Sequence, residues 1–89
     1  MLIGRVVGNV VATQKNAKLE GAKLLLVQPL DLDGNERGGV VVAVDGVDAG
    51  LGDRVLLTMD GKSAMQVLNR GLAAVDAAVL GVVDAVERA

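Results

Sequence analysis

The sequence predicts a mainly β protein: a small barrel of five strands, closed on itself, that assembles with other copies. Five apolar stretches of strand length alternate with turns rich in Gly and Asp, whereas only one short stretch has fair helix propensity. Of the 89 residues, 52% are apolar. A domain of this size buries only about 60–65% of its unfolded surface. The surplus apolar surface is therefore expected at a subunit interface.

The composition excludes several classes of function. Cys and His are absent, which removes disulfides, Cys–His and Ser–His catalysis and the commonest zinc and haem ligands. Phe, Trp and Tyr are also absent and the net charge is −2. These features disfavour nucleic acid and anionic membranes as partners. The sequence shows no secretion signal and no apolar run near the roughly 18–20 residues that span a bilayer, so we expect a soluble intracellular protein.

The first two strands are expected at Leu2–Val11 and Lys23–Leu30, with a polar connection over Ala12–Ala22. Alternation along the first strand puts Gly4 and Gly8 on its apolar face. Glycines at such positions suggest bends or close contacts between backbones.

A turn follows the second strand. Pro29 cannot donate to a strand ladder, so it marks a strand end or an edge. The cluster Asp31–Asn35 then favours a hairpin into a third strand at Val40–Val44. This cluster resembles the start of a calcium-binding loop, but Glu36 stands at the sixth position in place of Gly, and Val42 at the twelfth in place of Glu. We therefore expect no calcium site.

The chain is organised around an acidic, glycine-rich loop, Asp45–Arg54, between the third strand and a fourth strand at Arg54–Met59. Three carboxylates in one loop can form a metal or acid–base site. Because histidine is absent and glycine is frequent, turn and capping roles are favoured instead. We interpret this loop as a structural junction, with the candidate residues Asp45, Asp48, Gly50, Gly52 and Asp53.

The last third of the chain is expected to hold one short helix and a fifth strand. Lys62–Arg70 has fair helix propensity over one or two turns. The preceding Gly61-Lys62-Ser63 resembles the end of a phosphate-binding loop, but Leu56 stands where that motif requires Gly. Val75–Val86 fits both a helix and a buried strand, and its valines and Gly81 favour the strand.

Several of these strands are apolar on both faces. In a parallel α/β protein, helices would cover both faces, but this sequence offers no long helix. A closed barrel interior on one side and a neighbouring subunit on the other would cover them. Closure also removes most edge strands.

Five short motifs occur in order along nearly the whole chain: Gly4–Lys15, Leu19–Gln28, Asp45–Leu56, Gly61–Met65 and Val75–Asp84. Their residues and spacing resemble those of the EutN/CcmL family, the pentameric vertex proteins of bacterial microcompartment shells. The chain departs from the family pattern at four positions. Asp48 replaces a glycine, Lys62 a serine and Met65 an arginine, and Ala74 stands where a proline is usual.

The resemblance implies an OB-like barrel, a single domain over residues 1–89, and a homopentamer. In the family, such rings close the fivefold vertices of an icosahedral shell, in the bacterial cytoplasm, whose facets are tiled by hexameric and trimeric shell proteins. The expected role is structural, with no catalytic residue, cofactor or metal and no nucleic-acid or membrane partner.

The resemblance also suggests two sets of site residues. The candidate subunit-contact or loop-structural residues are Asp45, Asp48, Gly50, Gly52 and Asp53. The candidate pore-proximal residues are Gly61, Lys62 and Ser63, and five copies of Lys62 near the fivefold axis would favour anions.

Two other classes of function compete with this interpretation. One is a small OB-like barrel that binds another ligand or partner, such as single-stranded nucleic acid. Barrels of that kind use aromatic platforms and basic grooves, which this sequence lacks. The other is a small enzyme, which would depend on carboxylates, lysines and hydroxyls, and no paired constellation of these stands out.

Overall fold

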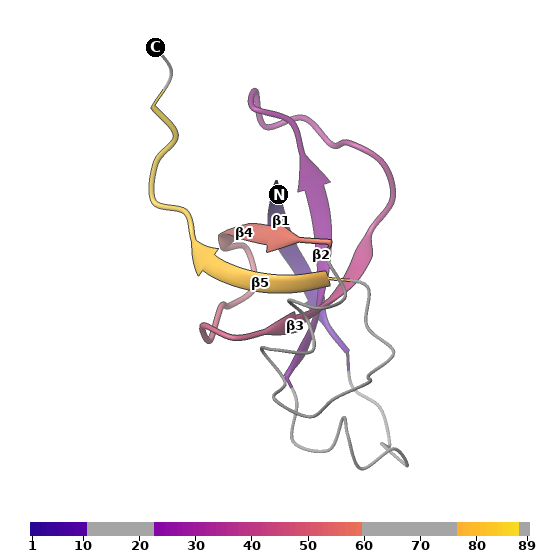
Figure 1. The fold of residues 1–89 in the computed structure, drawn as a ribbon. Coiled ribbons are helices and arrows are strands. Elements are labelled where there is room, and N and C mark those ends of the chain that lie inside the picture. Colours follow the sequence, from indigo (N-terminus) through magenta and orange to yellow (C-terminus); the bar gives the residue numbers. More distant parts are fainter. Residues whose placement is uncertain (11–22, 60–76, 88–89) are drawn as a thin grey trace.

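The computed structural model describes residues 1–10, 23–59 and 77–87, which form a closed β-barrel (Figure 1). The strands are β1 (Leu2–Asn9), β2 (Leu24–Leu30), β3 (Val41–Asp45), β4 (Arg54–Thr58) and β5 (Ala77–Val82). This architecture confirms the predicted all-β class. The predicted helix at Lys62–Arg70 lies outside the described residues. Within the described ranges, no helix has the length and apolar character needed to cross a bilayer.

The strands follow the order β1-β2-β3-β5-β4 around the barrel, and β4 closes onto β1. All neighbours are antiparallel except β3 and β5, which run parallel. The expected hairpin is present, since β2 pairs with β3 from Leu24, opposite Val44, to Val27, opposite Val41. Pro29 lies beyond this paired part, near the end of β2. Its missing N–H group therefore removes no hydrogen bond from the β2–β3 ladder.

The strand bounds differ from the prediction by one residue for β2, β3 and β4, and by more at the two ends of the strand assignment. The first strand was expected to reach Val11, but β1 ends at Asn9. The last was expected over Val75–Val86, but β5 ends at Val82 and residues 83–87 leave the barrel. The reason for the earlier end of β5 is the length of β4. The Val83 amide donates to the Arg54 carbonyl (2.8 Å), and Arg54 is the first residue of β4, so no strand remains beyond it for pairing.

In the described part of the chain, the core cluster of the barrel consists of aliphatic side chains. Val55 and Leu57 point inward from β4, and both are fully buried. They pack in one cluster with residues from the other strands and from the loop after β3: Val6, Leu25, Val27, Ala43, Ala49, Ala77 and Val79. Small and medium side chains can fill a narrow barrel without aromatic rings, which explains how the composition supports the fold.

The glycine positions of β1 serve the two purposes that the sequence suggests. A Cβ atom on Gly4 would lie 2.5 Å from the Val27 Cγ1 atom and 3.1 Å from the Gln28 carbonyl oxygen, so two strands approach too closely there for a side chain. The register between β1 and β2 shifts between Val6 and Gly8. This bulge bends β1 as it curves around the barrel.

Candidate assembly site

Asp45, the last residue of β3, organises the first half of the acidic loop. Its carboxylate accepts hydrogen bonds from the amides of Val47 (2.9 Å) and Ala49 (2.8 Å). The same side chain is fully buried and lies 3.3 Å from the ammonium group of Lys23. Two backbone amides and one cation therefore compensate for the burial of this carboxylate.

Lys23 binds three groups of this half-loop. Besides Asp45, its Nζ atom donates to the Asp48 carboxylate (3.0 Å) and to the Ala49 carbonyl (2.8 Å). The lysine is brought there by the ladder between β2 and β3, because the Asp45 amide donates to the Lys23 carbonyl (2.9 Å). The hydrogen bond to Asp48, followed by that to Asp45, raises the pKa of Lys23 above its ordinary value.

Asp53 organises the second half of the loop. Its carboxylate accepts from the Gly50 amide (2.8 Å), and its own amide donates to the Gly50 carbonyl (3.0 Å). Two further backbone bonds fix this turn to β1: the Gly52 amide donates to the Val6 carbonyl, and the Val6 amide donates to the Asp53 carbonyl, both at 2.9 Å. Gly52 has φ +86°, a conformation that favours glycine, whereas Gly50 has no such requirement.

The backbone conformation of Asp48 and its contact with Lys23 explain why this residue can replace the glycine of the family pattern. Its φ is +58°, and it is the only non-glycine residue with positive φ among the described residues. Glycine reaches this region at no steric cost, which accounts for the glycine of the family pattern. Aspartate is one of the few other residues that tolerate it. Here its carboxylate gains Lys23 as a partner.

The structure therefore brings Asp45 and Asp48 together through Lys23 and places Asp53 in a separate turn. Lys23 was not among the residues predicted for this site. The available signal was its place directly before an apolar strand, inside the motif Leu19–Gln28. No group of three or more acidic, His or Cys side chains in the described ranges is arranged to hold a metal. Gly61, Lys62 and Ser63 lie outside those ranges, and their pore role stays a prediction.

A second ordered loop, residues 31–40, connects β2 to β3. The Asp31 carboxylate accepts from the amides of Asp33 and Asn35, both at 2.9 Å. These bonds, with that from Asn35 the strongest, lower the pKa of Asp31. The buried Gln28 side chain donates to the Gly38 carbonyl (3.0 Å) and holds the far end of the loop. The tight turn at Asp31–Asn35 and this anchor fix the loop against the barrel.

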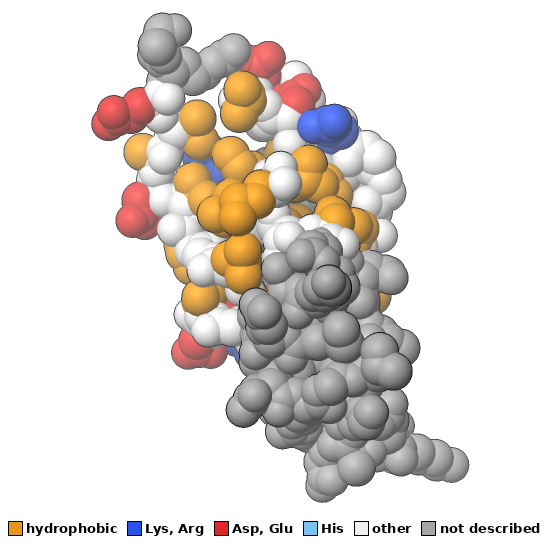
Figure 2. Space-filling model, in the orientation of Figure 1, with side chains coloured by type: hydrophobic (Ala, Val, Ile, Leu, Met, Phe, Trp, Pro, Cys, Tyr) orange, Lys and Arg blue, Asp and Glu red, His pale blue; other side chains and the backbone are white. Residues whose placement is uncertain are grey.

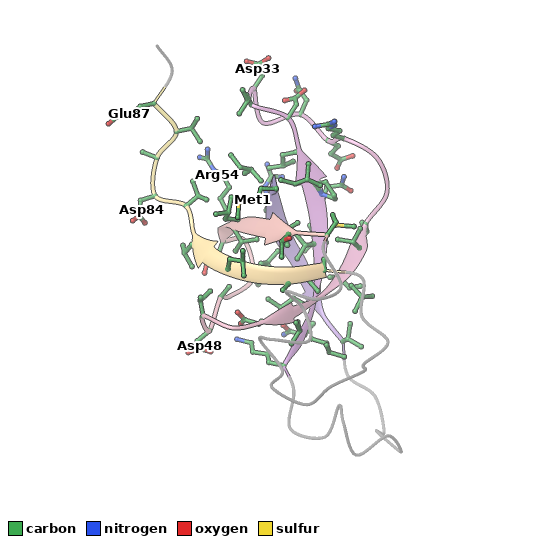
Figure 3. All side chains as sticks on the ribbon, in the orientation of Figure 1. Met1, Asp33, Asp48, Arg54, Asp84 and Glu87 are labelled. Atoms are coloured by element: carbon green, nitrogen blue, oxygen red, sulfur yellow. The ribbon has the colours of Figure 1, made fainter. Side chains whose placement is uncertain are left out.

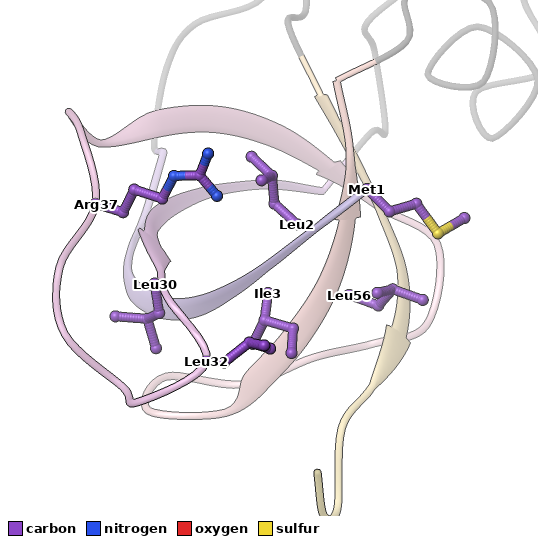
Figure 4. Close-up of a pocket in the computed structure, with 7 residues that line it drawn as sticks. All are labelled: Met1, Leu2, Ile3, Leu30, Leu32, Arg37 and Leu56. Atoms are coloured by element: carbon purple, nitrogen blue, oxygen red, sulfur yellow. The ribbon is translucent and has the colours of Figure 1, made fainter. Parts of the chain in front are cut away.

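An open pocket of about 220 Å³ lies between this loop, the start of β1, the end of β2 and the middle of β4 (Figure 4). Six apolar side chains and one cation line it: Met1, Leu2, Ile3, Leu30, Leu32, Leu56 and Arg37. None of the described residues that line it has a carboxylate, an imidazole or a hydroxyl group. The lining therefore offers neither a nucleophile nor a general base.

Exposed apolar side chains gather on the outside of the barrel. Figure 2 shows hydrophobic side chains gathered on the face that carries β4 and β5 in Figure 1. Exposed members on or next to these strands are Met59 (44% exposed), Leu80 (37%) and Val82 (46%). Exposed apolar side chains in a contiguous group indicate a contact surface for another protein.

A closed aliphatic barrel whose loops are fixed by side-chain-to-backbone bonds, and whose outer face is apolar, defines a structural subunit of a larger assembly. The comparisons with known proteins give its family. The chain belongs to the EutN/CcmL family, because the family model described as "Ethanolamine utilisation protein EutN/carboxysome" matches residues 1–84.

Full-length relatives support this assignment. The bacterial microcompartment shell vertex protein PduN of Salmonella typhimurium is 47% identical over 88 residues, covering 94% of this chain and 96% of that protein. GrpN of Rhodospirillum rubrum, also named a shell vertex protein, is 44% identical over 87 residues, covering 98% of this chain and 97% of that one.

Solved structures have the same fold. The pentameric microcompartment shell protein GrpN superposes with a TM-score of 0.85 at 43% identity and covers all of both chains. The structure of CcmL from Gloeobacter violaceus gives a TM-score of 0.87 at 43% identity, covering 99% of this chain and 90% of that one. The family resemblance found in the sequence is confirmed.

Proposed function

We propose that this protein is a structural shell protein of a bacterial microcompartment that forms homopentamers and closes the fivefold vertices of the shell. The observation that carries this proposal is the end-to-end match, at 43% identity and a TM-score of 0.85, to a protein whose solved structure is a pentameric shell protein. The apolar outer surface of the barrel supports assembly independently of any relative.

The proposed role is geometric. A sheet of hexamers is flat, and a closed shell needs fivefold positions where the sheet bends. The partners are therefore other copies of this chain within the ring and hexameric or trimeric shell proteins around it, in the bacterial cytoplasm. The chain acts as one domain over residues 1–89, without catalysis or a cofactor. Its described residues offer carboxylates already bound to backbone amides and a pocket without catalytic groups.

Co-expression with shell proteins tests the proposal. Hexameric and trimeric shell proteins of one microcompartment would be produced with and without this chain, and the particles examined by electron microscopy. We expect closed polyhedral shells that contain the chain only in its presence, and open sheets or elongated bodies in its absence. Shells of equal closure in both cases, with none of the chain bound, would contradict the proposed function.

The same shells test the predicted pore residues. If Lys62 lies near the fivefold axis, Lys62→Gln would lower the passage of small anions into closed shells, because five positive charges would be removed from one opening. Unchanged anion permeability would end this part of the proposal and leave the vertex role standing.

A further inference from the structure

Two arginines face each other on the outside of the barrel. Arg5 of β1 pairs in register with Arg54 of β4, and both side chains are exposed. Cross-strand partners have Cβ atoms only about 5 Å apart, and like charges at such positions destabilise a sheet. No ion pair joins either arginine to a carboxylate in the described ranges, where the ion pairs are those of Lys23 with Asp45 and Asp48. Within the described part of the subunit, these two positive charges thus have no compensating carboxylate.

Apolar side chains adjoin this pair on the same outer surface. Ile3, two residues before Arg5 on β1, lies opposite Leu56, which is two residues after Arg54 on β4. The neighbour of Ile3 on β2, Leu30, is buried. Residues two apart on a strand point to the same face. The outer face of β1 and β4 therefore presents an arginine row beside an apolar row. We call this surface the arginine face: Ile3, Arg5, Arg54 and Leu56.

The opposite charge is carried by the segment after β5. The arm, residues 83–87, makes one backbone hydrogen bond to the barrel, from Val83 to Arg54, and then extends away from it (Figure 1). Asp84 and Glu87 on the arm are exposed and have no ion-pair partner among the described residues. In Figure 3 both carboxylates point to the side of the arm away from the barrel, while Arg54 lies on the barrel side.

We infer that the arm of one subunit binds the arginine face of the next, with Asp84 and Glu87 paired to Arg5 and Arg54 and the apolar row buried beneath the contact. Three residues of extended chain span at most about 10 Å, so two carboxylates at this spacing can each reach one member of the arginine pair. The contact neutralises the like-charge pair that an isolated subunit leaves exposed.

A second copy of the chain is the occupant that the geometry favours. The carboxylates of the arm point away from Arg54 of the same subunit, so these two parts of the contact face in different directions. Two different surfaces on one subunit give a head-to-tail interface, the type that builds closed rings. The inference rests on the proposed pentamer, because the ring supplies the second copy of the chain to which the arm binds.

Charge reversal tests the contact. The pair Arg5→Glu/Arg54→Glu and the pair Asp84→Lys/Glu87→Lys would each be compared with the wild type by light scattering over a dilution series at physiological salt. We expect either pair to raise the concentration at which the ring dissociates by at least about tenfold. The combined fourfold variant, with the charges exchanged, should restore assembly. Glu36→Lys reverses an exposed carboxylate on the loop 31–40 that does not line the pocket. It should leave assembly unchanged and is the control for charge reversal as such.

A cysteine pair gives a readout that does not depend on charge. Because the chain has no cysteine, Arg5→Cys with Glu87→Cys introduces the only two thiols. Oxidation should give a ladder of covalently linked subunits on a non-reducing gel, up to five, whereas each single variant stops at two. The inference would be overturned if the cysteine pair ran only as a monomer on the gel after oxidation. It would also be overturned if the charge-reversed pairs assembled like the wild type. In either case a pentameric wild type would leave the proposed function intact, whereas a wild type that forms no ring would contradict the proposed function itself.

Discussion

The Lys23 Nζ atom lies 3.3 Å from the Asp45 Oδ2 atom, a carboxylate oxygen whose side chain is fully buried. This contact joins the start of β2 to the end of β3 and, through the amides of Val47 and Ala49, fixes the loop that follows. Two backbone amides and one ammonium group therefore bind the Asp45 carboxylate.

Asp45→Ala should destabilise the fold by about 2 kcal/mol, because two backbone amides lose their acceptor and Lys23 loses its buried counter-charge. Urea unfolding at a fixed protein concentration, followed by far-UV circular dichroism, measures the change. The sequence has no Trp or Tyr, so fluorescence gives no signal. Glu36→Ala removes an exposed carboxylate from the other loop and should leave the midpoint unchanged. Equal midpoints for both variants would contradict the structural role of Asp45.

Substitutions at Asp48 should follow its backbone conformation. With φ at +58°, Asp48→Gly removes backbone strain while losing the exposed bond to Lys23, so we expect little net change in stability. Asp48→Ala loses the bond and keeps the strain, which costs about 1 kcal/mol, and Asp48→Val should cost more. Thermal unfolding of the three variants checks the order. An Ala variant as stable as the Gly variant would show that the conformation is not strained.

Gly4→Ala should destabilise the barrel by about 1–3 kcal/mol, because the new methyl group would lie 2.5 Å from the Val27 Cγ1 atom and the strands must separate. Gly81→Ala is the matched control: Gly81 also lies in a strand, and a Cβ atom there meets nothing within 4 Å. Calorimetric unfolding should separate the two by several degrees. Similar unfolding temperatures would contradict the close approach of β1 and β2.

Asp31 should make stability depend on acid pH. Its folded-state pKa lies below the ordinary value of 3.8, because backbone amides stabilise the ionised form. The unfolded chain therefore binds the proton more readily. The contribution of Asp31 is fully present above pH 3.8 and is lost as the pH falls through the lower folded-state pKa. Asp31→Ala should be less stable than the wild type at neutral pH, and the difference should shrink below pH 3.8. A difference that is constant with pH would exclude this role.

Local sequence patterns predict the strands well but not their partners. Val55 and Leu57 alternate cleanly, so the sequence shows both the strand and its buried face. The parallel pairing of β3 with β5 joins residues more than thirty positions apart in the chain, such as Ala43 and Ala77, and no local pattern encodes it. The end of β5 was predicted four residues too late because its apolar residues continue past the point where β4 stops.

The candidate site was predictable in part for the same reason. Dense glycine and aspartate indicate an ordered turn, and Asp45 and Asp53 do bind backbone amides. Lys23 enters the site only through the register of β2 and β3, which places it beside Asp45. The facing of Arg5 and Arg54 depends on the register of β1 and β4 in the same way. Contacts across strands follow from the barrel and cannot be read from residue spacing.

The native mass in solution tests the central claim most directly. Light scattering on a gel-filtration peak should be combined with refractive-index detection, since the chain has no Trp or Tyr to absorb near-ultraviolet light. We predict a single species of five times the subunit mass of 9.0 kDa, maintained on dilution. A monomer or dimer that persists across the concentration series would contradict the vertex role and leave the apolar outer surface without a partner.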